Sequence, residues 1–171
     1  YNDSNQESFN PSDNMNGCKI SLIKNNDNSN IYFSIARGYK QGGFNLGLDA
    51  TDNSIKNSLI YDPEFLTNYE IGLSSNNNDS ILNYSAVFFF SKREDQQVLI
   101  SRQVDPTDPN TFSYLTQNAA EGENYGIEVS SEYFVRGNLN LFFNFGLLKT
   151  KIKNWESRID LENRAQAHAP E

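Results

Sequence analysis

The sequence contains very little histidine, cysteine and basic charge, and each shortage excludes a class of function. His168 and Cys18 are the only residues of their types in the 171-residue chain. A Ser-His-Asp arrangement or a His/Cys metal cluster therefore has almost nothing to build on, and an internal disulfide is excluded. Asp and Glu number 22 against 14 Lys and Arg, for a net charge of −8, which argues against binding to nucleic-acid phosphates. We expect no enzyme, no metal or cofactor site and no nucleic-acid partner.

Long apolar runs are missing as well. The longest uninterrupted run extends only from Ala86 to Phe90, whereas a membrane-spanning helix needs about 20 apolar residues. Membrane-spanning strands leave a much weaker signal, because only alternate side chains face lipid. The sequence therefore excludes transmembrane helices and leaves a transmembrane barrel open.

What the sequence does have is alternation of apolar and polar residues with a period of two, which predicts strands with one chemistry on each face. The clearest runs are 67–74, 81–94, 123–134 and 139–150. Asn, Asp and Gly gather between the runs and mark turns. Short connections are expected at 25–30, 75–80 and 135–138, and long ones at 41–64, 95–122 and about 151–169.

These patterns predict an all-β fold, an antiparallel up-and-down meander of about six strands. Short and long connections alternate along the chain, so all short turns would lie at one end and all long loops at the other, as in outer-membrane barrels. The apolar lines are also rich in aromatic residues, and tyrosines cluster at the ends of the runs, as is typical of a lipid–water boundary. The alternative is a soluble sheet with one face on a core.

The two faces of the predicted barrel wall can be assigned by residue. The lipid-facing set is Tyr69, Ile71, Tyr84, Phe88, Ile127, Val129, Leu141, Phe143 and Phe145. The lumen-facing set is Asn68, Glu70, Ser85, Arg93, Glu128, Ser130 and Asn144. In the long loops, Tyr61, Phe112 and Tyr114 are candidates for stacking against a ligand.

The stretch "RGYKQGGFN" (37–45) ends one alternating run in charge and then paired glycines. It is not a phosphate loop, because no Lys-Ser/Thr pair and no helix follow the glycines. Gly42 and Gly43 are expected to let the backbone bend into the loop. Strict alternation places Arg37 on the outward face, so either its side chain reaches the membrane interface or a bulge turns it inward.

Four stretches, in order, resemble TonB-dependent outer-membrane receptors, especially the siderophore-receptor type. They are "IYFSIARGYKQGGFN" (31–45), "YDPEFLTNYEIGLSS" (61–75), "LNYSAVFFFSKREDQQV" (82–98) and "AEGENYGIEVSSEY" (120–133). The resemblance covers roughly residues 18 to 150. One departure is "GLSS", which lacks the lysine that usually follows Gly-Leu in that family.

The resemblance implies that residues 1–171 are part of the β-barrel domain, a fragment of a larger C-terminal transmembrane barrel of 22 strands, without the plug domain. It implies a receptor in the outer membrane of a Gram-negative bacterium that takes up a metal-siderophore or a similar scarce solute. The implied partners are the plug domain, the TonB complex that supplies energy, outer-membrane lipid and a metal-chelate ligand. A porin or adhesin barrel and a soluble β-sheet binding module are the alternatives.

Overall fold

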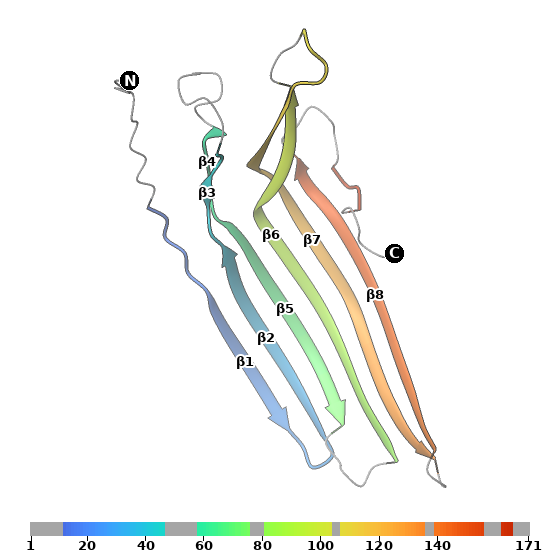
Figure 1. Ribbon diagram of the computed structural model, residues 1–171. Helices are drawn as coiled ribbons and strands as arrows, with labels where there is room; N and C mark the ends of the chain where they lie inside the picture. Colours follow the sequence, from blue (N-terminus) through green and yellow to red (C-terminus); the bar gives the residue numbers. More distant parts are fainter. Residues whose placement is uncertain are drawn as a thin grey trace.

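The computed structural model describes residues 12–46, 58–75, 81–103, 107–135, 139–155 and 162–165, which form one layer of antiparallel strands (Figure 1). The six strands of the sheet are β1 (Cys18–Asn25), β2 (Ser29–Lys40), β5 (Glu64–Ser75), β6 (Leu82–Gln103), β7 (Phe112–Val135) and β8 (Leu139–Trp155). They lie side by side in chain order, which confirms the predicted all-β meander. Two short strands, β3 (Gly43–Phe44) and β4 (Ile60–Tyr61), pair with each other between β2 and β5.

The connections are sorted by end, as the sequence indicates (Figure 1). Residues 26–28, 76–81 and 136–138 join strands at one end, while residues 41–63 and 104–111 join them at the other. In the first turn, the Asn26 backbone N–H donates to the Ser29 carbonyl at 2.8 Å. Residues 76–80 and 136–138, and most of the expected connection after β8, lie outside the described residues. Within the described residues, no helix is long and apolar enough to cross a membrane.

The expected loop at 95–122 is wrong. β6 continues to Gln103 and β7 begins at Phe112, and the two strands pair up to the contact between these residues. Polar side chains occur on both faces of this upper hairpin, which hides the alternation in the sequence. Asp95 marks the change, because it has a positive φ of 53° and the register between β6 and β7 shifts beside it. β8 likewise extends to Trp155, into the last expected connection.

The buried apolar residues lie at the long-loop end and not in the body of the sheet. They are Leu59, Leu115, Ala119, Ala120 and Ile152. In the body, Phe88, Leu141 and Phe143 remain 52%, 52% and 57% exposed. Soluble monomers rarely leave such a large continuous apolar patch in water. No second layer of described residues covers this face, so its cover has to come from outside the described residues.

On the opposite face, two aromatic rings lie over cross-strand glycines. Tyr32 pairs with Gly72, and Phe89 pairs with Gly126. A Cβ atom added at Gly72 would collide with the Tyr32 ring, and one at Gly126 would come within 2.8 Å of the Phe89 ring. The rings therefore fill the space that a side chain would occupy, which fixes the register between neighbouring strands.

We predict that Gly126→Ala destabilises the intact protein by about 1–3 kcal/mol, the usual range for overpacking. The added methyl would meet both the Phe89 ring and the Leu147 carbonyl oxygen. Gly146→Ala is the matched control in β8, because a Cβ there meets nothing within 4 Å. The denaturant midpoint of unfolding measures the difference, and equal midpoints for the two variants would contradict the packing argument.

Candidate functional site

One face of the sheet carries a network of polar side chains. The Ser91 hydroxyl donates to Asn68 Oδ1 at 2.6 Å, and Asn68 Nδ2 donates to Glu70 Oε1 at 2.7 Å. The Ser34 hydroxyl donates to the other Glu70 oxygen at 3.4 Å. This network joins β2, β5 and β6. Further along the same face, the Ser85 and Ser130 hydroxyl oxygens are 2.8 Å apart, and Ser130 pairs with Asn144 of β8.

Glu70 and Glu128 lie on this polar face on either side of β6. Glu70 is opposite Phe89, and Glu128 is opposite Val87. The sequence could not place them near each other, because they belong to β5 and β7. Among the described residues, neither carboxylate is in an ion pair with a lysine or arginine. Higher on the face, Arg93 Nε lies 3.2 Å from Glu64 Oε1.

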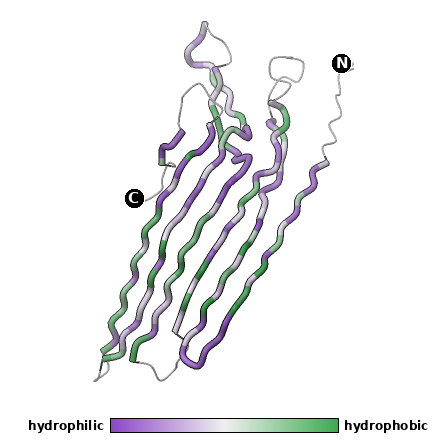
Figure 2. Tube along the Cα trace, turned by 180° about the vertical axis from the view of Figure 1, so that it is seen from behind, coloured by the Kyte–Doolittle hydropathy of each residue, from purple (hydrophilic) through white to green (hydrophobic). Residues whose placement is uncertain are grey.

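Apolar and polar residues alternate along the strands (Figure 2). The register places the side chains of the other face in three successive rows across the sheet, which change from apolar to aromatic to charged. The first row is Phe33, Ile71, Phe88, Ile127 and Leu147. The next is Ile35, Tyr69, Phe90, Tyr125 and Lys149, with the Tyr69 and Phe90 ring centroids 6.2 Å apart. The third is Arg37, Thr67, Lys92, Glu123 and Lys151, which we call the charged row. The predicted residues Tyr84, Val129, Leu141, Phe143 and Phe145 lie on the same face, nearer the short turns.

Arg37 stays on this second face without a bulge. Its pairing with Cys18 of β1 and with Thr67 of β5 is regular. The guanidinium carbon lies 4.5 Å from the centroid of the Phe65 ring, a cation–π contact. The regular pairing excludes the bulge, one of the two alternatives that the sequence leaves open, and Arg37 lies on the same face as the apolar rows, at their edge.

At the long-loop end, two asparagine amides hold the 41–63 connection against the upper β6–β7 hairpin. Asn45 Oδ1 accepts from the Thr116 N–H at 2.7 Å, and Asn45 Nδ2 donates to the Thr116 carbonyl at 2.8 Å. In the same way, Asn118 Oδ1 accepts from the Asp62 backbone N–H at 2.7 Å, and Asn118 Nδ2 donates to the Asp62 backbone carbonyl at 2.8 Å. Each amide thus satisfies both backbone groups of one residue, as a neighbouring strand would.

Gln97 completes this arrangement, which we call the rim clamp and define by Asn45, Asp62, Gln97, Thr116 and Asn118. Gln97 Nε2 donates to the Gln41 carbonyl at 2.9 Å and to the Asp62 carbonyl at 3.0 Å. Its backbone N–H donates to Glu64 Oε2 at 3.0 Å. The two ends of the 41–63 connection, near Gln41 and near Asp62, are therefore hydrogen-bonded to β6 as well as to β7.

The paired glycines serve the rim clamp in a way that the sequence did not indicate. A Cβ atom at Gly42 would lie 2.5 Å from the Tyr61 carbonyl oxygen, and one at Gly43 would lie 2.5 Å from the Tyr61 hydroxyl. Neither glycine has a φ in the left-handed region. They permit the close approach of β4, and the chain leaves the six-stranded sheet at this point, since β3 belongs to a separate two-stranded sheet. Of the three ligand-stacking candidates, Tyr61 is half-buried on Gly43, whereas Phe112 and Tyr114 are 52% and 67% exposed.

Comparison with known proteins identifies the family to which this sheet belongs. Residues 2–167 match the family described as "TonB dependent receptor-like, beta-barrel". The chain belongs to the TonB-dependent receptor family. The resemblance seen in the sequence is thereby confirmed, and the family is one of outer-membrane transport receptors and not of enzymes.

Two receptors of known structure have a similar fold. The ferric yersiniabactin uptake receptor FyuA from Yersinia pestis is 19% identical, with a TM-score of 0.60 over 81% of this chain and 19% of that chain. The alcaligin outer membrane receptor FauA from Bordetella pertussis is 19% identical, with a TM-score of 0.51 over 78% of this chain and 22% of that chain. The chain therefore spans about a fifth of the length of each receptor.

The stretches that carry the family resemblance converge on the rim clamp of this TonB-dependent barrel. The first stretch supplies Asn45, the second supplies Asp62, and the third supplies Gln97. Asn118 lies just before the fourth. Sequence reasoning used these stretches to identify the family but did not assign the clamp residues a role. The signal was present in the amide side chains at the ends of the first and third stretches.

We predict that Asn118→Ala loosens the 41–63 connection without unfolding the sheet. The substitution removes the acceptor of the Asp62 N–H, the Asn118 donor to the Asp95 carbonyl and one of the two donors to the Asp62 carbonyl, each bond contributing about 1 kcal/mol. Amide hydrogen exchange at Asp62 in the full-length receptor should accelerate at least tenfold. The control is Asn154→Ala in β8, an exposed side chain outside the clamp. If exchange at Asp62 is as slow in Asn118→Ala as in the control, the clamp is not what holds the connection.

Proposed function

We propose that the chain is a section of the barrel wall of a TonB-dependent receptor in the outer membrane, with its apolar face toward lipid and its polar face toward the lumen. The observation that carries this proposal is the three-row change from apolar through aromatic to charged side chains on one face only. Outer-membrane barrels carry an outward apolar band flanked by aromatic residues. The stretch of β6 from Leu82 to Lys92 rises about 34 Å at about 3.4 Å per residue. Tilted by about 40°, it matches the band height of about 25 Å.

The polar face is suited to a lumen filled by another part of the receptor. Glu70 accepts hydrogen bonds only from Ser34 and Asn68 among the described residues, and Glu128 has no ion-pair partner there. When a plug domain fills the lumen, these carboxylates leave bulk water, and an unpaired buried charge costs several kcal/mol. We therefore propose that the plug presents lysine or arginine side chains to Glu70 and Glu128.

The long-loop end is the outer end of the barrel in this proposal, and it supplies binding and no catalysis. The upper hairpin places Leu99, Phe112 and Tyr114 on one face, with Leu99 70% exposed. Two proteins with a fold similar to this chain are named as receptors for ferric yersiniabactin and alcaligin. We infer that the full-length receptor takes up a metal-chelate of the siderophore type, with energy from the TonB complex, and that these exposed side chains contact the chelate.

The lipid assignment predicts that a charge at Phe88 is tolerated much less well than one in the charged row. Arginine at the bilayer midplane costs about 2–4 kcal/mol, but only about 0–1 kcal/mol near the interface. Phe88→Arg should therefore lower the amount of folded full-length receptor in the outer membrane severalfold. Thr67→Arg, on the same face, should leave it nearly unchanged. Equal losses for both variants would mean that Phe88 does not face lipid.

The recognition assignment predicts that Phe112→Ala combined with Tyr114→Ala weakens chelate binding about tenfold, since an aromatic contact contributes about 0.5–1.5 kcal/mol. The measurement is the Kd of the full-length receptor for the ferric chelate that it binds best in a panel of siderophores. Phe142→Ala is the control, because that ring is 70% exposed and lies near the short-turn end. An unchanged Kd in the double variant would exclude these two rings from recognition.

A further inference from the structure

The ladders of the six-stranded sheet stop at one level below the rim. Three pairs of neighbouring strands show this by their uppermost residue pairs, which are Lys40 with Glu64, Phe65 with Glu94, and Ala120 with Trp155. Above this level β6 and β7 continue as the upper hairpin (97–103 and 112–118), and within the described residues they pair only with each other. β3 and β4 form a second hairpin at the same end (Figure 1). Two hairpins therefore continue beyond the sheet.

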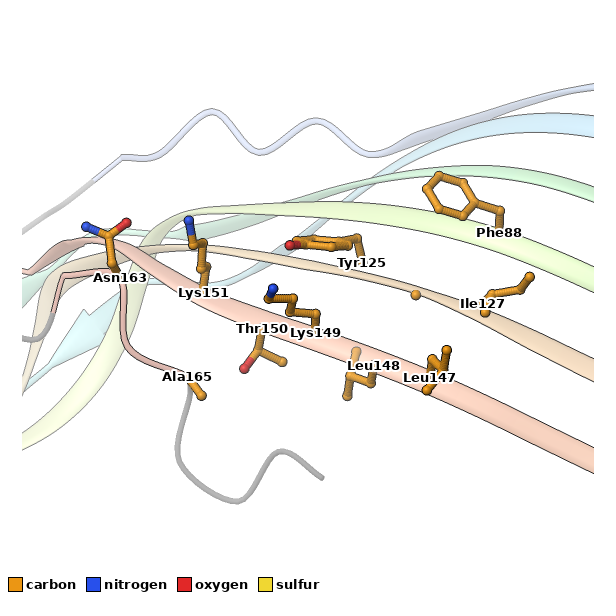
Figure 3. A pocket seen from close by; sticks show the side chains of 11 residues that line it. Phe88, Tyr125, Ile127, Leu147, Leu148, Lys149, Thr150, Lys151, Asn163 and Ala165 are labelled. Atoms are coloured by element: carbon orange, nitrogen blue, oxygen red, sulfur yellow. The ribbon is translucent and has the colours of Figure 1, made fainter. Parts of the chain in front are cut away.

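The backbone is irregular where β6, β7 and β8 reach this level. Asp95 of β6 has a positive φ of 53°, and the register between β6 and β7 shifts on both sides of Gln96. The register between β7 and β8 shifts beside Gly122. Lower in the sheet the alternation is regular, so Thr150 and Lys151 point to opposite sides of β8 (Figure 3). Because such irregularities disrupt the ladder and bend strands, this level, which we call the hinge line, resists bending least.

The rim clamp joins the two hairpins to each other. Asn45, just after β3, bonds both backbone groups of Thr116 in the upper hairpin. Asn118 of the upper hairpin bonds both backbone groups of Asp62, just after β4. Leu115 of the upper hairpin is 2% exposed, so apolar packing adds to these bonds. Four hydrogen bonds at least must break before the hairpins separate.

The upper hairpin is also braced against the sheet, through Glu64. The Gln97 N–H donates to one Glu64 oxygen at 3.0 Å, and Arg93 Nε lies 3.2 Å from the other. This brace acts beside the hinge line itself, so it limits a pivot less than contacts farther up the hairpin would. The bonds of Thr116 and Asn118 lie farther up, and they connect the hairpin to the 41–63 connection and not to the sheet.

We infer that β3, β4 and the upper hairpin form one body, which we call the rim body, and that it pivots about the hinge line as a unit. Such a motion leaves the rim clamp intact and uses the irregular backbone at Asp95 and Gly122. Hinges in proteins are likewise a few residues that absorb the change in φ and ψ while packed parts move rigidly. The inference rests on the proposed function only where recognition is concerned. A solute held by Phe112 and Tyr114 would move the 41–63 connection together with the upper hairpin.

The test measures distances between pairs of spin labels in the full-length receptor by double electron–electron resonance, without any solute. The exposed Cys18 is first replaced by serine. Leu46, which is 89% exposed, labels the 41–63 connection, Ser101 labels the upper hairpin, and Ile71 labels the sheet. We expect the Leu46–Ser101 distribution to be as narrow as that between Ile71 and Leu141, two positions in the sheet. The distributions from Leu46 and from Ser101 to Ile71 should each be about twofold wider, since hinge motions on the μs–ms scale are trapped on freezing.

Breaking the rim clamp should release the two hairpins from each other. We expect Asn45→Ala with Asn118→Ala to widen the Leu46–Ser101 distribution about twofold, because the hydrogen bonds between the hairpins are lost. The matched control is Asn140→Ala with Asn154→Ala, which changes two exposed asparagines of β8 outside the clamp. The control should leave the distribution unchanged.

Two rim-to-sheet distributions as narrow as that of the sheet pair would overturn the inference, because the rim would then be rigid. A Leu46–Ser101 distribution as wide as the rim-to-sheet ones, or one that stays narrow in the clamp variant, would overturn it as well. Siderophore binding is measured separately. A receptor whose rim body pivots as a unit but that binds no chelate refutes the proposed function alone, whereas one that binds a chelate with a rigid rim refutes this inference alone.

Discussion

A sheet of one layer cannot bury its own apolar face, and this constraint governs the rest of the structure. The buried apolar residues lie at the long-loop end, while Phe88 and Phe143 stay exposed. At about 25 cal/mol for each Å² of apolar surface removed from water, covering the face is a dominant stabilising term. In the proposed barrel wall, lipid supplies that cover, and the sheet then needs no second layer of protein. The same constraint explains why the charged row begins where it does, because charge inside the lipid band is costly.

The backbone imposes a second demand at the rim, where the strands have unequal lengths. β7 extends beyond the end of β8, since the last residue pair between them is Ala120 with Trp155. Above that point one edge of β7 would expose unpaired backbone groups, which invite association with other chains. Asn45 occupies both backbone groups of Thr116 on this stretch. The rim clamp therefore protects an edge as well as anchoring a loop.

The sequence could predict the features that follow from a local residue pattern, such as the strands. It could not predict the features that require two distant segments to come together, such as contacts between strands. The bodies of the strands were predictable, because a sheet with one apolar face and one polar face has alternating residues along each strand. The upper hairpin was not, because above the charged row both faces carry polar side chains and the alternation disappears. Arg37 was ambiguous for a related reason, since only the regular pairing with Cys18 and Thr67 excludes a bulge. The placement of Glu70 and Glu128 on one face, on either side of β6, depends on the register, which no single run contains.

The chemistry of the rim clamp separates the anchoring of the loops from their proposed recognition surface. Asn45, Gln97 and Asn118 bind backbone atoms of their partners, including the carbonyls of Gln41, Ser58 and Asp62. A backbone carbonyl is present whatever side chain the residue carries, so the clamp places few demands on the sequence of the connection that it holds. Side chains such as Phe112 and Tyr114, which point away from these contacts into solvent, can therefore change without loosening the rim. A receptor wall built in this way can keep its fold while the outer surface is altered to recognise a different solute.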